Sequence, residues 1–452
     1  MKTKNILKIS VILTMCIFIT FNSLAAESSK KPEDIIKSCI DDQTFAVIHV
    51  NIEKLSISAF VEKVKDIFEK QAGSDSSNRS IAMFDDLNNF DEQVNAHIND
   101  LKKLGTKDCF VIFSMYDFPY FFVAFQAGSD QAGLTKKILD IMEDFDIGTL
   151  DMYSNDGLII AGLEQTIARI KTIKPVKSDI LSRGLEACGD TTFQTILFPS
   201  SDQRKIMAEM LPQISFGTER IDFTELMRDF EWAALGLDSP PSMSMNVTIQ
   251  SQNSEKADKI LSIIKNLYSF AEQNPNTQEF REQISQVLKL MTPQKRDSQI
   301  LLNVDSKIFD SIINEYIAPS ILKTQDKAYR LVCATNLSGI GKAILIYAND
   351  NDDNLPPNLE ILTSTVEMPP KGLICPSTGQ KDSYIYRGAG LTTSDEPGMV
   401  LAYDKKGNHE GGRNVLFLDS HVDWVTEERF QEYIRKDNES RKKTNRPEIS
   451  AD

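Results

Sequence analysis

The sequence predicts an α+β protein whose body is a duplicated arrangement of antiparallel strands covered by helices, followed by a smaller C-terminal module. Three observations lead to this prediction. Short apolar runs alternate with amphipathic helical stretches from residue 41 to residue 325. Two blocks of this region recur in the same order. A long helical stretch of different composition then begins near residue 318.

The first residues have the layout of a secretory signal peptide. MKTKNILK supplies three lysines and no acidic residue, and the apolar run ISVILTMCIFITF is followed by small residues in SLAA. Since this run is shorter than the ~20 residues of a membrane-spanning helix, we expect cleavage after Ala25 or Ala26. Residues 1–25 are therefore predicted to be a signal peptide, and the mature chain to be periplasmic or secreted.

The charge of the chain restricts its partners. The formal net charge is −15, and loss of the three signal lysines lowers it to about −18. An acidic chain of this kind is a poor nucleic-acid binder, so we expect an unknown protein partner at the cell envelope. We expect no transmembrane helix after signal cleavage, because no later stretch reads as long and apolar enough.

The body contains an internal duplication. The segment 41–68 resembles 189–214 in an Asp, a Thr-Phe pair, a strand and then a helix, and 109–142 resembles 232–267 in a similar way. We therefore predict one α+β repeat at 26–175 and a second at 176–317. Each repeat should have antiparallel strands with helices on one face.

The cysteines give no metal or redox motif. Five remain after signal cleavage, widely spaced and without a CxxC pair, which suggests neither a zinc site nor a thioredoxin-type centre. Export permits disulfides, and Cys39 and Cys188 could pair because they precede the two repeats at matching positions. Cys109 opens an apolar strand and is predicted to stay free.

The C-terminal module carries a family resemblance in three pieces. These are CATNLSGIGKAILIYANDNDDNLPP from Cys333, LICPS at 373–377, and NHEGGRNVLFLDSHVDWV at 408–425. Together they resemble the globular part of pseudopilin-like proteins of planctomycetes, verrucomicrobia and lentisphaerae. Their C-terminal signature, a His followed nine residues later by Asp-Gly, is called the prepilin-type processing-associated motif. The resemblance covers 318–430 and implies a long helix packed on a small antiparallel sheet.

Two departures limit what the resemblance implies. The family's N-terminal apolar helix with its peptidase site is absent, and the α+β body stands in its place, so the resemblance does not imply pilus assembly. Ser420 also replaces the glycine of the motif. Cys333 and Cys375 both lie in family motifs, and in an exported chain they could form a disulfide between the helix and the CPS loop.

The motif itself predicts a hairpin. Residues 414–418 and 421–425 should be strands joined by the two-residue turn Asp419-Ser420, with Leu416 opposite Asp423. Asp-Gly is favoured in such turns because both central residues need positive φ, which Ser420 tolerates less well. The motif residues are accordingly interpreted as structural, and these are His409, Gly411, Gly412, Asp419 and Ser420.

An enzyme is the alternative interpretation. An extracytoplasmic hydrolase or metal-dependent enzyme could use His409, Asp419, His421 and Asp423, provided that these side chains converge. The intervening strand should instead hold His409 roughly 20 Å from Asp419, at ~3.3 Å per residue. We therefore predict no catalytic residues and no cofactor, and a non-enzymatic structural or interaction protein of the bacterial envelope.

Two further segments of the C-terminal part are rich in charged residues. Asp350, Asp352 and Asn354 alternate like the start of a calcium loop, but Leu355 and Ile361 stand where an EF-hand has Gly and Glu. They are the only calcium candidates, and we expect a solvated helix-end loop and no metal. Residues 431–452 are highly charged without apolar periodicity and are predicted to be a disordered tail.

Overall fold

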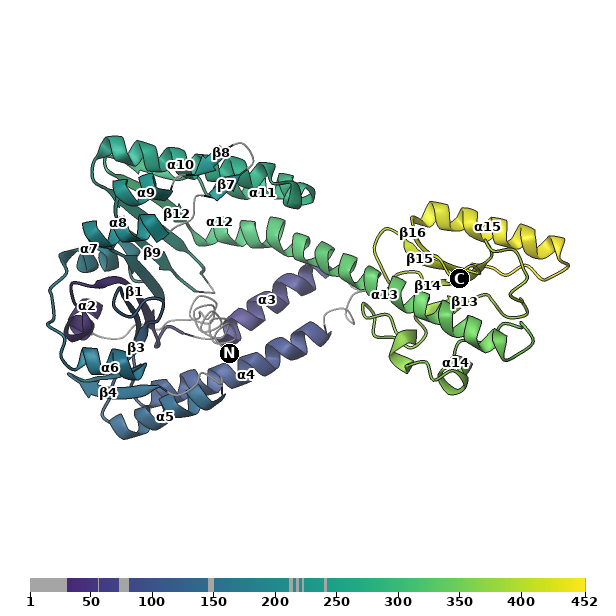
Figure 1. Cartoon of the computed structure of the whole chain (residues 1–452), viewed down its shortest axis with the longest axis horizontal. Helices are drawn as coiled ribbons and strands as arrows, with labels where there is room; N and C mark the ends of the chain where they lie inside the picture. The colour runs from purple at the N-terminus through teal and green to yellow at the C-terminus, as the bar shows by residue number, and fades with distance from the viewer. Residues whose placement is uncertain are drawn as a thin grey trace. The chain divides into compact units, whose positions relative to one another are not determined.

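The structure is a computed structural model that describes residues 31–451, apart from 56, 73–80, 145–149, 211–213, 217–218, 222 and 240–241. The predicted signal peptide, 1–25, lies outside the described residues. The described chain is α+β, as expected from the sequence (Figure 1). It forms two compact units, which are Met1–Ile67 with Asp85–Ile317, here called the body, and Phe68–Phe84 with Ala318–Asp452, here called the C-terminal unit.

The body is built on one ten-stranded antiparallel sheet. Its strands, in the order in which they pair, are β11 (Gln294–Arg296), β12 (Gln299–Val304), β10 (Met245–Ser251), β9 (Phe230–Leu237), β6 (Phe193–Leu197), β1 (Thr44–Asn51), β2 (Asp108–Ser114), β3 (Phe122–Gln126), β5 (Leu158–Gly162) and β4 (Asp151–Asn155). A separate two-stranded sheet is formed by β7 (Ile214–Phe216) and β8 (Glu219–Ile221).

The strand order repeats about the centre of the sheet. Outward from the centre, one half of the sheet has the order β1, β2, β3, β5, β4, and the other half has the order β6, β9, β10, β12, β11. In both halves the last two strands of the sheet are exchanged relative to their order in the sequence. The two copies join where β1 pairs antiparallel with β6, so that Val47 lies opposite Ile196 and Val50 opposite Phe193. The same strand order thus occurs on both sides of the β1–β6 pair.

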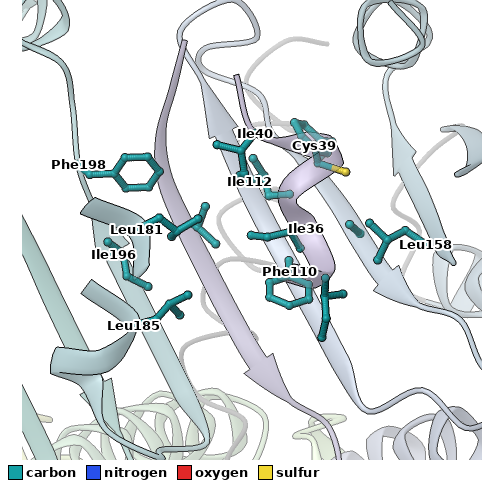
Figure 2. Close-up of a cluster of buried hydrophobic side chains, with 14 of the residues drawn as sticks. Ile36, Cys39, Ile40, Phe110, Ile112, Leu158, Leu181, Leu185, Ile196 and Phe198 are labelled. Carbon is teal, nitrogen blue, oxygen red and sulfur yellow. The ribbon is translucent and has the colours of Figure 1, made fainter. Parts of the chain in front are cut away.

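Helices cover both faces of this sheet, so the expectation of helices on one face is wrong. On one face the core includes Val47, Phe110 and Ile196, with side chains from α2 (Pro32–Ile36), η1 (Lys37–Cys39), α6 (Glu164–Ile170) and α7 (Asp179–Cys188). Figure 2 shows part of this cluster. The central strands are buried on both sides, which explains their nearly continuous apolar sequence.

The opposite face has its own helices. Ile48 and Val50 contact a cluster with side chains from α3 (Ile57–Ala72), α4 (Ile81–Lys103) and α5 (Gln131–Asp144), and α10 (Ser254–Gln273) covers the second repeat. The remaining helices of the body are α8 (Ser201–Met210), α9 (Phe223–Asp229), η2 (Pro275–Phe280), α11 (Arg281–Leu290), α12 (Ser306–Ser311) and η3 (Ile312–Ile317).

The C-terminal unit is a four-stranded antiparallel sheet between two helices. Leu416 and Leu418 belong to the cluster formed with α13, and Val415 and Phe417 to the cluster formed with α15. This alternation places one helix on each face. The elements are α13 (Ala318–Asn349), α14 (Ile361–Thr365), η4 (Pro370–Leu373), β13 (Tyr384–Tyr386), β14 (Val400–Asp404), β15 (Arg413–Phe417), β16 (Val422–Val425) and α15 (Glu427–Lys443).

The helical run that includes α13 is longer and more apolar than we expected of any segment after the signal peptide. The run Ser306–Asn349 has 44 residues and is, by length and composition, apolar enough to cross a membrane, with 39% of its most apolar stretch buried. The expectation that no later stretch meets these criteria is therefore wrong. The fold accounts for much of this apolarity, because Leu337, Ile340 and Ile344 pack in the core of the small sheet.

The C-terminal residues are ordered, so the predicted disordered tail at 431–452 is wrong. Helix α15 buries Phe430 and Ile434 against the sheet. It also carries Asp437, whose carboxylate is buried with Arg387 and Arg441. The buried face of α15 combines two apolar residues with the charged Asp437 and Arg441, and its other positions are polar. The sequence therefore shows no regular apolar stripe by which the helix could be predicted.

Candidate functional site

The prominent polar group of the C-terminal unit comes from three distant segments. Cys333 lies on α13, Cys375 follows η4, and His409 lies in the loop between β14 and β15. All three are buried, and their ligand-capable atoms lie within 4.8 Å of one another. Among the described residues, this is the group of three that could hold a metal ion.

Two glycines give the His409 loop its path. Gly411 has φ +81°, which a residue with a side chain adopts only with strain. At Gly412 a Cβ would come within 2.2 Å of the carbonyl oxygen of Val425. The backbone path of this loop thus requires glycine at both positions.

The imidazole of His409 is held at both nitrogens. Nδ1 lies 3.4 Å from Oδ1 of Asp326 on α13, and Nε2 lies 3.7 Å from Sγ of Cys375. The ring also lies edge-on to Trp424, with centroids 6.1 Å apart. Burial lowers the pKa of His409, but Asp326, Cys375 and Asp404 outweigh it and raise the pKa to about 9.

The two thiols differ in their affinity for a proton. A hydrogen bond from the Cys333 thiol, aided by His409 and by the backbone N–H of Ser377, lowers the pKa of Cys375 to about 4. The same bond to Cys375, together with burial, raises the pKa of Cys333. The shared hydrogen bond thus favours the thiolate form of Cys375 over that of Cys333, and His409 lies beside Cys375.

A buried carboxylate completes the group. Asp404 is 0% exposed, and its Oδ2 accepts hydrogen bonds from the backbone and side-chain nitrogens of Asn414, both at 2.8 Å. Oδ2 also lies 3.7 Å from Nε2 of His409. The other oxygen, Oδ1, is buried without a hydrogen-bond partner. Burial raises the pKa of Asp404 to about 6.

The cysteines expected to form bridges are free thiols in this structure. Cys333 and Cys375 lie together, but no disulfide joins them. Cys39 and Cys188 belong to the same core cluster of the body and are also free. Cys109, which was expected to form no disulfide, is buried on β2 and is not bridged to another cysteine.

The hairpin after His409 differs from the prediction by one residue in register. Leu416 lies opposite Val422 and not Asp423. The connection has three residues, because Phe417 N–H donates to the carbonyl of His421 and Ser420 N–H donates to that of Phe417. Only Ser420 has positive φ, +70°, as in a type I turn followed by a left-handed residue.

The residues of the enzyme alternative do not converge. Asp419 contacts His421 in the exposed turn, and each side chain is about half exposed. The side chain of His409 is instead fully buried beside Asp326 and Asp404, and no contact with Asp419 is found among the described residues. Asp423 lies on β16, opposite Val415.

The calcium candidates lie at the end of α13. Asn354 donates its side-chain Nδ2 to the carbonyls of Asn351 and Asp352, at 3.0 and 3.2 Å, and so closes its own turn. The carboxylate of Asp350 accepts from Asn349. These bonds are those of a solvated helix end, and the expectation that no metal binds here stays a prediction.

Sequence reasoning missed the group of Cys333, Cys375 and His409. Each residue was singled out, but they are 42 and 34 positions apart, and zinc ligands are ordinarily read from short spacings. The available signal was that all three stand in the family motifs of the module. Asp326 and Asp404 had no sequence signal.

Comparison with known proteins adds little. No family model matches the chain, and no curated protein matches it. Among solved structures, crystal form I of TP0453 matches with 10% sequence identity and a TM-score of 0.28, covering 64% of this chain and 99% of that chain. A TM-score this low shows no shared fold.

Proposed function

We propose that this chain is an exported protein of the bacterial cell envelope that acts as a structural or interaction protein and not as an enzyme. The observation that carries the proposal is the separation of its polar motif residues. His409 is sealed inside the C-terminal unit, while Asp419 and His421 pair with each other in a solvated turn. A catalytic site needs its acid–base groups within reach of one substrate atom.

Burial also argues against a thiol enzyme. Cys375, His409 and Asp326 follow one another in the order of a nucleophile, a base and an orienting carboxylate. However, Cys375 is 0% exposed, as is the side chain of His409. A substrate could reach the sulfur only if the helix and sheet separated.

The resemblance of the C-terminal unit to pseudopilin-like proteins supports an envelope role. In both, a long helix packs on a small antiparallel sheet. The charge of the chain and its N-terminal sequence agree with export. The pilus-inserting segment of that family is absent, so we propose attachment to an envelope protein and not assembly into a filament.

Export is tested by producing the full chain in a bacterial host and fractionating the cells. We expect mature protein beginning at Ala26 or Glu27 outside the cytoplasm. The matched variant Leu13→Arg, which places a charge in the apolar run, should stay uncleaved inside the cell. Wild-type protein that keeps Met1 and remains cytoplasmic would contradict the proposal.

The non-enzymatic role is tested on the purified protein with chromogenic ester, phosphate, glycoside and peptide substrates. We expect no turnover above that of the variant His421→Ala. Turnover that disappears in His421→Ala, or a native Cys375 that reacts rapidly with iodoacetamide, would favour the hydrolase. Cross-linking in intact cells of the source organism should in addition give a discrete product containing an envelope protein.

A further inference from the structure

We infer that Cys333, Cys375 and His409 bind one zinc ion inside the C-terminal unit, with the buried carboxylate of Asp404 beside the site. The site would be structural. It would tie the long helix, the loop after η4 and the loop before β15 to one another at a point that no solvent reaches.

The geometry suits a tetrahedral ion. Zinc lies about 2.3 Å from a cysteine sulfur and about 2.0–2.1 Å from a histidine nitrogen, so two of its ligands are under about 4 Å apart. Cys375 Sγ and His409 Nε2 are already at 3.7 Å, and the three ligand atoms lie within 4.8 Å of one another. Small side-chain rotations would bring all three onto one ion.

The orientation of His409 is that of a metal ligand. Nε2 points toward Cys375, while Nδ1 faces the carboxylate of Asp326. A zinc-bound histidine ordinarily donates its second ring N–H to a carboxylate or carbonyl, which fixes the ring and makes the free nitrogen a better ligand. The Asp326 contact supplies this support from about two turns before Cys333 on the same helix.

Hydrogen bonds around the sulfurs favour thiolates. The backbone N–H of Ser377 lowers the pKa of Cys375, and the hydroxyl of Tyr384 acts in the same direction on the pKa of Cys333. The side-chain amide of Asn336 donates to the Tyr384 oxygen at 3.1 Å and leaves that hydroxyl proton free for the sulfur. Such donors stabilise the charged form of a thiol that coordinates a metal.

Asp404 provides an independent observation. It is fully buried, and its Oδ1 has no hydrogen-bond partner, although an unpaired buried carboxylate oxygen is costly. Its Oδ2 lies at 3.7 Å from the same Nε2 that faces Cys375. A divalent cation held by the three ligands would offset the negative charges of the thiolates and of this buried carboxylate.

Binding balances without a redox step. Zinc would bind both sulfurs as thiolates and His409 through the lone pair of Nε2. The thiol proton of the cysteine pair and the Nε2 proton of the His409 imidazolium both leave to solvent, so two protons are released per ion. The competing fate of the two thiols is a disulfide. That requires an oxidant to remove two electrons and two protons.

The test uses the full chain, reduced, freed of metal with a chelator and titrated with Co²⁺. We expect one Co²⁺ per chain, thiolate-to-cobalt charge-transfer absorption, and loss of that absorption when Zn²⁺ is added. Cys375→Ser and His409→Ala should lose the charge-transfer signal or weaken it strongly. The control Cys109→Ala, which changes a buried cysteine of the body, should keep it. Asp326→Asn should weaken binding about 10–100-fold, as expected for a supporting carboxylate.

Three outcomes would overturn the inference. One is a folded, reduced wild-type chain that shows no thiolate-to-cobalt absorption, a result that does not depend on any variant folding. Another is an unchanged signal in Cys375→Ser. The third is a Cys333–Cys375 disulfide, found by mass mapping of non-reduced protein from the envelope of its source organism.

Discussion

Arg387 and Asp437 form an ion pair that solvent does not reach. Nη2 of Arg387 lies 2.7 Å from Oδ2 of Asp437, and both side chains are 0% exposed. The same Oδ2 accepts from Nε of Arg441 at 2.9 Å, while Oδ1 accepts from the backbone N–H of Val400. One carboxylate thus joins α15 to β14 and neutralises part of the charge of two buried arginines.

Removal of this carboxylate should be among the most destabilising single changes in the C-terminal unit. We expect Asp437→Ala to lower its free energy of unfolding by about 3–5 kcal/mol, because two guanidinium groups lose their counter-ion. Denaturant titration and limited proteolysis near α15 would measure this. The control Glu439→Ala, at an exposed position of the same helix, should change the free energy by less than about 0.5 kcal/mol. Equal effects of the two variants would refute the role of the pair.

Ser420→Gly should stabilise the same unit. Ser420 has φ +70°, and its buried hydroxyl has no hydrogen-bond partner. Its side chain therefore destabilises the fold both through backbone strain and through an unsatisfied polar atom. We expect a gain of about 1 kcal/mol from relief of the backbone and removal of the unsatisfied oxygen. Thermal or denaturant unfolding measures the gain, with Ser420→Ala as the control that removes the hydroxyl and keeps the strain. A Gly variant no more stable than the Ala variant contradicts the backbone argument.

Two glycines of α13 should respond differently to alanine. At Gly339 a Cβ would meet nothing within 4 Å, so Gly339→Ala should stabilise by about 0.5–1 kcal/mol through helix propensity. At Gly341 a Cβ would lie 3.0 Å from Leu416 and 3.5 Å from the Ser420 hydroxyl oxygen. Gly341→Ala should therefore gain nothing or destabilise, since the helix would be pushed off β15. Equal gains at both positions in denaturant titration would show that the helix does not press on the hairpin there.

The reduced body should lose stability at alkaline pH through two core thiols. Burial raises the pKa of Cys39 from 9.0 to about 11 and that of Cys188 to about 12. Because both folded values are raised, the stabilisation is fully present below pH 9 and falls as the pH rises through 11 to 12. Between pH 9 and 11 each thiol should contribute a decline of about 1.4 kcal/mol per pH unit. Denaturant midpoints of wild type and Cys39→Val measure this, and the variant should fall less steeply. Parallel curves would contradict the burial of a neutral thiol.

The sequence specified the α+β class and the repeat because these depend on apolar periodicity, which is a local signal. It did not specify the second helical layer, since a strand such as β1 that is apolar on both sides gives no indication of which helix will cover each side. The hairpin register depended on one residue. Ser420 alone takes positive φ, so the turn gained a residue and every predicted cross-strand pair moved by one.

The buried polar group was beyond local patterns for a different reason. Cys333, Cys375 and His409 come together only when α13 packs on the small sheet. The same packing decides which face of α13 is turned toward the imidazole, and so places Asp326 at Nδ1 of His409. Sequence could name the motif residues and assign His409 to the loop before the strand. It could not show which side chains that loop would face.

The antiparallel pairing of β1 with β6 has a consequence for how the body assembles. Strands β1 and β2 come from one repeat, but the other edge of β1 is closed by a strand that begins about 140 residues later in the chain. Until β6 arrives, a repeat that has folded by itself presents a long apolar strand edge, the kind of edge that recruits strands from neighbouring chains. Linking the two copies in one polypeptide raises the local concentration of the correct edge far above that of any competitor. A chain cut between α6 and α7 should therefore either reassemble from its two fragments or form self-paired dimers of each.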